Sequence, residues 1–191
     1  MERLDAALID LPGVEVRVIE RCGSTNSELL QERGRLPLLL AAEEQTAGRG
    51  RRGHRWHSAP GADITFSLAC RLTRPLRELA PLSLVAGVAA ASALRSLGVR
   101  QASLKWPNDL MADGAKLGGI LVETQAEGSA TRAVIGIGIN CRREPGLEKR
   151  LRRRIAALED FARPPRNRVI QEVGRALLEA LDRFEEGGFD A

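Results

Sequence analysis

Alternating apolar and polar positions mark the first predicted strand of this 191-residue chain. Residues 14–20 alternate in this way, which is typical of a half-buried strand, and residues 36–43 form an apolar run that predicts a buried one. Between them, the capping-box spacing of Thr25 and Glu28 predicts a short helix that begins at Ser24 or Thr25.

The following region alternates regular elements with one long irregular segment. Residues 45–62 are rich in glycine and arginine and show no periodicity, so we expect a long loop there. Residues 64–72 predict another strand. Residues 75–97 are rich in alanine and leucine and predict a long helix, broken near Pro81 and ended by Gly98.

The second half of the chain predicts a run of strands and then two helices. The strands are expected at residues 102–106, 110–112, 117–125 and 131–141, and the helices at 147–161 and 168–184. Asp113-Gly114 is a hairpin signal between the second and third of these strands. The order predicts an α+β fold, a mixed and largely antiparallel sheet with helices packed on one face. We expect a single domain over residues 1–191.

Composition narrows the class of protein without choosing a function. Hydrophobic residues make up 43% and charged residues 28%, which is ordinary for a globular domain. No apolar run reaches the length of a membrane span, so no membrane partner is expected. The three cysteines form no CxxC pair and suggest a reducing compartment, which predicts a cytoplasmic protein. The net charge of +4 favours anionic partners in general.

Lysine is rare in this chain, and its placement is the first chemical signal. Of 29 basic residues only Lys105, Lys116 and Lys149 are lysines. The first opens Lys-Trp-Pro-Asn-Asp and the second opens Lys-Leu-Gly-Gly-Ile-Leu. An ammonium is a compact charge with a tunable pKa. Lysine at these two positions therefore suggests that an arginine guanidinium could not replace it there. Chance clustering is the alternative.

The segment from Gly48 to Trp56 is the second signal. Glycines let a backbone approach a ligand and expose its N–H groups to an anion, and arginines add bidentate contacts to phosphate or carboxylate. Such a segment also fits an arginine-rich nucleic-acid contact with Trp56 as a stacking platform. Its position between two strands favours a loop held by a scaffold.

Five stretches together resemble the bacterial biotin protein ligases, in that family's order and approximate spacing. They are Ser24 to Asn26, Gln45 to Gly53 with Trp56, Lys105 to Asp109, Lys116 to Glu123, and Gly136 to Asn140. The resemblance implies a fold related to the class II aminoacyl-tRNA synthetase cores and to lipoate ligases.

The resemblance also implies a reaction in two steps. Biotin and Mg-ATP would give biotinyl-5′-adenylate and pyrophosphate, with ATP and Mg²⁺ as co-substrate and ion. A specific lysine of the partner, the biotin carboxyl carrier protein of acetyl-CoA carboxylase, would then take the biotin. The chain is therefore expected to be a biotin–[acetyl-CoA-carboxylase] ligase.

Site residues follow from the same resemblance, position by position. The catalytic set is Lys116, Arg49, Arg51 and Asp109. The biotin-binding set is Ser24, Thr25, Asn26, Gln45, Arg49, Gly50, Arg51, Lys116, Gly118 and Gly119. The ATP-binding set is Arg49, Arg51, Trp56, Lys116, Asn108 and Asn140, of which Asn108 and Asn140 are also candidate Mg²⁺ ligands.

Several of these residues keep a purely structural alternative. The polar residues at 24–26 also suit a helix cap, and Pro107-Asn108-Asp109 also suits a turn. Trp56 is either the partner of the adenine face or a core residue below the loop. The two glycines of the Lys116 stretch are explained equally well by a bulge.

Three departures from the family pattern qualify the resemblance. No N-terminal helix-turn-helix domain precedes the first strand, so direct DNA binding is not expected. The small C-terminal β-barrel domain is also absent, so we expect the catalytic domain by itself, in a minimal or truncated form. Asp63 stands where the family would lead us to expect Asn. The oligomeric state is left open, with a homodimer among the alternatives.

Two other functions remain open on the sequence. A lipoate or octanoyl ligase-transferase shares the fold and the target chemistry, although its family motifs are absent here. A basic nucleic-acid-binding module is the alternative from another class of protein, and it depends on the net charge and the arginine-rich loop.

Overall fold

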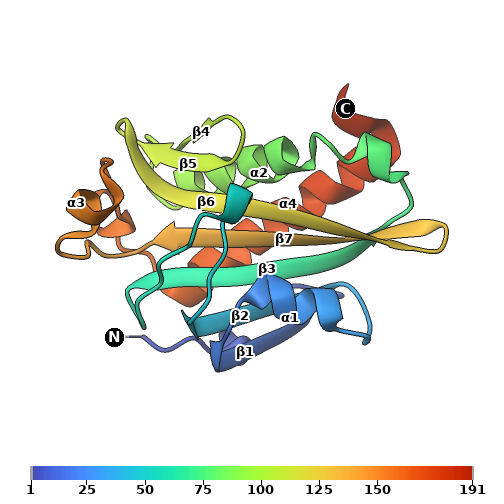
Figure 1. The fold of residues 1–191 in the computed structure, drawn as a ribbon, viewed down its shortest axis with the longest axis horizontal. Helices are drawn as coiled ribbons and strands as arrows, with labels where there is room; N and C mark the ends of the chain where they lie inside the picture. Colours follow the sequence, from blue (N-terminus) through green and yellow to red (C-terminus); the bar gives the residue numbers. More distant parts are fainter. Residues whose placement is uncertain (1, 191) are drawn as a thin grey trace.

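A seven-stranded mixed sheet organises the molecule in the computed structural model, which describes residues 2–190 (Figure 1). The strands lie in the order β1-β2-β3-β7-β6-β5-β4. Their bounds are β1 Glu15–Cys22, β2 Leu38–Gln45, β3 Asp63–Leu72, β4 Ser103–Lys105, β5 Asp109–Ala112, β6 Ala115–Glu127 and β7 Ala130–Asn140. Only β1 and β2 pair in parallel, and the other described pairs are antiparallel.

The two faces of the sheet have different coverings. Helices α2 (Leu82–Ser96) and α4 (Arg166–Gly187) pack on one face and enclose the main hydrophobic core. Helix α1 (Thr25–Gln31) lies on the opposite face, over a small cluster that includes Leu29 and Leu38. Figure 1 shows α1 in front of the sheet and the two long helices behind it. The front face beside α1 is therefore free of a long helix.

The α+β prediction is confirmed, together with the largely antiparallel mixed sheet. Packing on one face holds for the two long helices, whereas α1 lies on the other face. The short helix begins at Thr25, as predicted, with Ser24 as its N-cap. Among residues 2–190, none of the helices has the length and apolarity that crossing a membrane would require.

Two helix predictions need correction. The helix expected over residues 147–161 is wrong for most of its length, because α3 covers only Leu147–Leu151 and a single 3₁₀ turn covers Leu158–Asp160. Arg152 ends α3 in a left-handed conformation, and the chain then pairs with β6 through Lys116. The helix expected over 75–97 breaks near Pro81 as predicted, and its first part is only a 3₁₀ turn at Leu76–Glu78.

Asp63 begins β3 opposite Asn140 and is buried, with 7% of its surface exposed. One carboxyl oxygen accepts a 3.0 Å hydrogen bond from the backbone N–H of Ala59. Burial raises the pKa of Asp63 from 3.8 to about 7, and the charge of Glu144 contributes in the same direction. Below pH 7 this carboxyl is therefore mostly neutral, like the amide expected at the position.

We predict that Asp63→Asn stabilises the protein above pH 7. A carboxyl whose pKa is raised on folding contributes most stability below its unfolded pKa, and that contribution is lost as pH rises through the folded pKa of about 7. An amide keeps an acceptor for Ala59 and stays neutral, so the gain at pH 8 is at most about 4 kcal/mol, and near zero at pH 4. Urea unfolding at both pH values measures this difference, and a variant less stable than the parent at pH 8 would contradict it.

Candidate active site on the open face of the sheet

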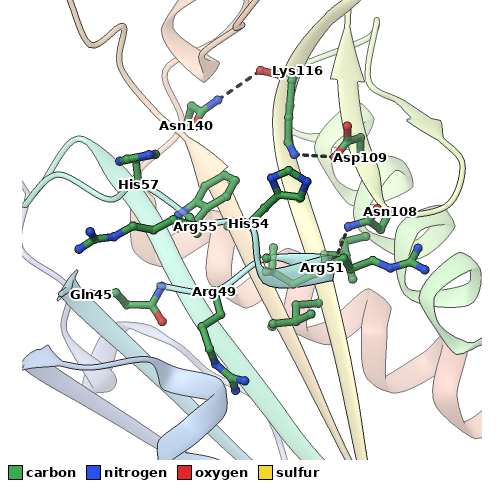
Figure 2. Close-up of a pocket in the computed structure, with 18 of the residues that line it drawn as sticks. Gln45, Arg49, Arg51, His54, Arg55, His57, Asn108, Asp109, Lys116 and Asn140 are labelled. Carbon is green, nitrogen blue, oxygen red and sulfur yellow. Dashed lines mark hydrogen bonds and ion pairs between the residues drawn. The ribbon is translucent and has the colours of Figure 1, made fainter. Parts of the chain in front are cut away.

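A cavity of about 550 Å³ lies on the face of the sheet that carries α1. Its floor includes Gly119, Gly136 and Gly138 of the central strands, and the glycine–arginine loop forms one wall. Figure 2 shows the charged side chains that surround it. Among the described residues, the lining contains six cationic side chains and one carboxylate, that of Asp109. The cavity is therefore suited to anionic ligands.

The glycine–arginine loop is a small closed hairpin. The N–H of Gly50 donates to the carbonyl of His54 at 2.7 Å, and the N–H of Trp56 donates to the carbonyl of Gly48 at 2.9 Å. Arg52 takes a left-handed conformation with φ 54° at the tip. A side chain at position 48 would bring a Cβ to within 2.8 Å of the Trp56 carbonyl, so glycine allows this closure.

Two glycines of β7 make room for side chains on the cavity floor. A Cβ at Gly136 would overlap the side-chain amide of Asn26, and a Cβ at Gly138 would overlap the indole of Trp56. Both positions lie on the same face of the strand because side chains alternate along it. The Gly-x-Gly spacing of the sequence is thus a requirement of close approach rather than of an unusual backbone angle.

Trp56 forms part of the cavity wall. Its indole lies over Gly138 and comes within 3.6 Å of the position that a Cβ at Gly119 would take. The ammonium of Lys116 is 6.0 Å from the ring. The indole Nε1 is buried and has no hydrogen-bond partner among the described residues. Trp56 is therefore neither a fully buried core residue nor a surface one.

A neutral polar network occupies the end of the cavity next to α1. The N–H of Thr25 donates to Gln45 Oε1 at 2.7 Å, and Thr25 Oγ1 lies 2.7 Å from Ser67 Oγ. Ser67 Oγ donates to Asn26 Oδ1 at 2.6 Å. Ser24, Thr25 and Asn26 are all at most 4% exposed, and the Ser24 side chain makes no capping bond. The segment therefore does more than cap the helix.

The opposite end of the cavity is charged. Lys116 Nζ lies 2.5 Å from Asp109 Oδ1, and Arg153 Nη2 donates to Asp109 Oδ2 at 2.8 Å (Figure 2 shows the first pair). Burial lowers the pKa of Lys116, and the carboxylate of Asp109 partly offsets this. Burial would raise the pKa of Asp109, but hydrogen bonds from Lys116 and Arg153 outweigh it and hold that pKa below its ordinary value.

Asn108 and Asn140 are both bound to backbone. Asn140 Nδ2 donates to the carbonyls of Lys116 and Ala156, and it is 6% exposed. Asn108 Nδ2 donates to the carbonyl of Ile120 at 2.8 Å. The two asparagines sit on either side of β6, so both help to hold the backbone around Lys116. Among the described residues no cluster of three His, Cys, Asp or Glu side chains could hold a metal ion.

The loop arginines point in different directions. Arg49 donates to Glu123 Oε2 at 2.6 Å, and Arg55 donates to the carbonyl of Thr46. Figure 2 shows Arg49 directed away from Lys116, whereas Arg51 extends toward the side of Asn108. Of these two arginines, Arg51 is therefore the one that extends toward the side of the cavity with Asn108.

The structure brings nearly all predicted site residues to one cavity. Those that line it are Ser24, Thr25, Asn26, Gln45, Arg49, Gly50, Arg51, Trp56, Asn108, Asp109, Lys116, Gly119 and Asn140. Gly118 is the exception, because it pairs with Ile139 and faces Leu110 on the helix-covered side. A register shift between Leu110 and Met111 accompanies it, which supports the bulge alternative for this glycine.

Three residues of the site were missed in the sequence. Ser67 and Glu123 complete the network below the cavity, and Arg153 holds Asp109. The sequence could have indicated Ser67, since it is a polar residue between the apolar Phe66 and Leu68 in the middle of a predicted strand. Arg153 had none, because it is one of several arginines in a segment that was predicted to be helical.

Comparisons with known proteins agree with this geometry. The Biotin/lipoate A/B protein ligase family matches residues 18–140. The bifunctional ligase/repressor BirA of Escherichia coli is 39% identical over 182 residues, 93% of this chain. The biotin–[acetyl-CoA-carboxylase] ligase of Mycobacterium tuberculosis is 35% identical over 85% of this chain. A biotin protein ligase from Aquifex aeolicus in complex with biotin and ATP superposes with a TM-score of 0.76 and 28% identity, covering 92% of this chain and 73% of that one.

The chain belongs to the biotin/lipoate A/B protein ligase family. It spans 57% of the length of the E. coli relative and 62% of the M. tuberculosis relative. The resemblance read from the five sequence stretches is therefore confirmed at the level of the family and the fold.

We predict that Gly138→Ala displaces Trp56 and weakens nucleotide binding. The added methyl overlaps the indole, so Trp56 must leave the floor, at a cost of about 1–3 kcal/mol in stability. Tryptophan fluorescence should shift to longer wavelength, and ATP affinity should fall. Gly23→Ala is the matched control, because a Cβ at Gly23 meets no atom within 4 Å. An unchanged emission spectrum in Gly138→Ala would contradict the assignment.

Proposed function

We propose that this chain is an ATP-dependent biotin protein ligase. It activates biotin to biotinyl-5′-AMP and transfers the biotin to a lysine of a biotin carboxyl carrier protein. The observation that carries the proposal is the polarity of the cavity. One end is a neutral donor-and-acceptor network, and the other holds Lys116 among further cations. Biotin has the same polarity, with a neutral ureido ring at one end and a carboxylate at the other.

The neutral end fits the ureido ring. Buried neutral donors and acceptors give orientation without the cost of burying a charge. Gln45 and Thr25 are on the cavity wall and are held in place by hydrogen bonds to each other. The ring would lie against the glycine floor, where no side chain intervenes.

The charged end fits the first half-reaction. A biotin carboxylate oxygen attacks the α-phosphorus of ATP, the bond to the bridging oxygen breaks, and pyrophosphate leaves. Two anions must approach each other, and preorganised cations lower this barrier most in a site that excludes water. Lys116 is the cation that would contact both the carboxylate and the α-phosphate, and Arg51 would close the loop over them.

Asp109 serves the second half-reaction in this proposal. The amine of the acceptor lysine attacks the acyl carbon of the adenylate, AMP leaves, and the amine loses a proton. Asp109 is the one carboxylate of the lining and could receive that proton. Its present partners, Lys116 and Arg153, would turn to the ligand anions while these are bound.

Magnesium would enter with the nucleotide in this scheme. Mg²⁺ takes oxygen ligands and keeps several waters, so one or two protein groups are sufficient. Asn108 is the better of the two candidates, because its side chain is half-buried whereas Asn140 is buried. We also propose a cytoplasmic location, and we leave the choice between monomer and homodimer to measurement.

The decisive experiment is biotin-dependent exchange of labelled pyrophosphate into ATP, because it reports the first half-reaction without an acceptor. The same assay with lipoate or octanoate in place of biotin tests the alternative function, that of a lipoate or octanoyl ligase-transferase. Exchange with lipoate and none with biotin would overturn the proposed substrate. The nucleic-acid alternative predicts salt-dependent binding of arbitrary DNA or RNA instead.

We predict that Lys116→Arg loses at least about 100-fold in the rate of single-turnover adenylate formation. A planar guanidinium is bulkier than an ammonium and cannot occupy the same point between two anions. Lys149→Arg, on exposed α3, is the matched control for the same change in chemistry. Adenylate formation at the parental rate in Lys116→Arg would remove this lysine from the mechanism.

We predict that Arg51→Gly releases biotinyl-adenylate at least about tenfold faster than the parent, because a hydrogen bond to a charged group is lost. The released anhydride should biotinylate lysines of a bystander protein, which blotting with labelled streptavidin detects. Arg52→Gly changes the same loop tip and should label the bystander far less. Equal retention of the intermediate by parent and Arg51→Gly would show that the loop does not hold it.

A further inference from the structure

Glu123 is a carboxylate of β6 that lies below the cavity and has no role in the reaction described above. Its Oε2 accepts two hydrogen bonds, from Asn26 Nδ2 at 2.9 Å and from Arg49 Nη2 at 2.6 Å. The side chain is 24% exposed. One oxygen atom therefore joins α1, the glycine–arginine loop and the central sheet.

The carboxylate determines the direction of the hydrogen bonds around Asn26. A carboxylate only accepts, so the amide nitrogen of Asn26 must face it. The second hydrogen of that nitrogen goes to the carbonyl of Leu121. Asn26 Oδ1 is then the acceptor for Ser67 Oγ, which uses the single hydrogen of that hydroxyl.

The direction of the hydrogen bonds is also fixed at the residues that line the cavity. Because the Ser67 hydrogen is committed to Asn26, the single hydrogen of Thr25 Oγ1 goes to Ser67 Oγ at 2.7 Å or to Gln45 Oε1 at 3.1 Å, and both acceptors belong to the network. The Thr25 hydrogen thus stays inside the network, and a ligand meets only the lone pairs of Thr25 Oγ1. Gln45 Oε1 accepts from the Thr25 N–H, which leaves the amide hydrogens of Gln45 as donors. The network offers one acceptor and one donor group side by side.

We propose that Glu123 is a positioning residue that fixes this donor-and-acceptor pattern and anchors the glycine–arginine loop through Arg49. The pattern is complementary to a cyclic urea, whose ring N–H donates and whose carbonyl accepts. The proposal rests on the proposed function for its ligand, whereas the anchoring of the loop does not depend on it.

Glu123→Gln tests both parts. The amide is nearly the same size, but its nitrogen can donate to Asn26 Oδ1, which allows Asn26 to turn and the chain of hydroxyls to reverse. Its oxygen can still accept two hydrogen bonds, but it carries no charge and therefore holds Arg49 more weakly than a carboxylate does. Glu127→Gln is the matched control, since Glu127 lies further along β6 and pairs with Arg71 and Arg132 outside the cavity lining.

Three measurements on the purified chain are needed: thermal unfolding, the rate of tryptic cleavage at the loop arginines, and biotin affinity by calorimetry. Relative to the parent and to Glu127→Gln, Glu123→Gln should be cleaved in the loop at least about fivefold faster and bind biotin about tenfold more weakly. The cleavage rate and the biotin affinity are measured at a temperature at which thermal unfolding shows the parent and both variants to be folded. This separates an effect on positioning from a loss of overall stability.

The outcomes separate this proposal from the function itself. A parent that binds no biotin contradicts the proposed function, and the cleavage rates then still test the loop anchor. Parental cleavage and parental biotin affinity in Glu123→Gln would overturn the proposal. So would losses in Glu127→Gln as large as those in Glu123→Gln, since the effect would then come from weakening β6 as a whole.

Discussion

The close approach of side chains to the backbone of β7 is the constraint on which the site depends. Gly136 and Gly138 leave the floor of the sheet bare, so Asn26 and Trp56 can lie directly on it. Any larger residue at either position would lift the polar network or the indole off the strand. The cavity exists because two central positions of a regular antiparallel ladder are glycines, which have no side chain to fill it. The backbone hydrogen bonds of that ladder keep the floor rigid.

The two faces of the sheet differ in composition and in covering, and this difference is related to the same constraint. One face is apolar and covered by α2 and α4, which bury most of the core. The other face carries only the short α1, so its strands could replace apolar residues with glycine, serine and threonine without losing the main core. The groups to which we assign catalytic roles come from strand ends and loops around this second face, where the backbone is held by β6 and β7.

The fold class could be predicted because it depends on local signals, and the residues that line the cavity were expected from the resemblance to a known family. The alternation of β1, the apolar run of β2 and the hairpin at Asp113-Gly114 are properties of short segments. The predictions that failed concern residues whose structure depends on tertiary contacts. Residues 152–156 look helical, yet they pair with β6 at Lys116, and only the folded sheet supplies that partner. Arg153 and Glu123 likewise gained roles from neighbours far away in sequence, and Gly118 differs from Gly119 because strand alternation turns them to opposite faces.

The carboxylate of Asp109 competes with anionic ligands for Lys116 and Arg153. Lys116 and Arg153 each hold one oxygen of this carboxylate, so its single negative charge compensates one of these two positive charges within the protein. A weakly charged anion from the surroundings gains little by displacing an internal partner that is fixed at hydrogen-bond distance. A ligand that brings several negative charges together with contacts at the neutral end gains much more. We therefore expect this end of the cavity to favour anions that can make several contacts at once.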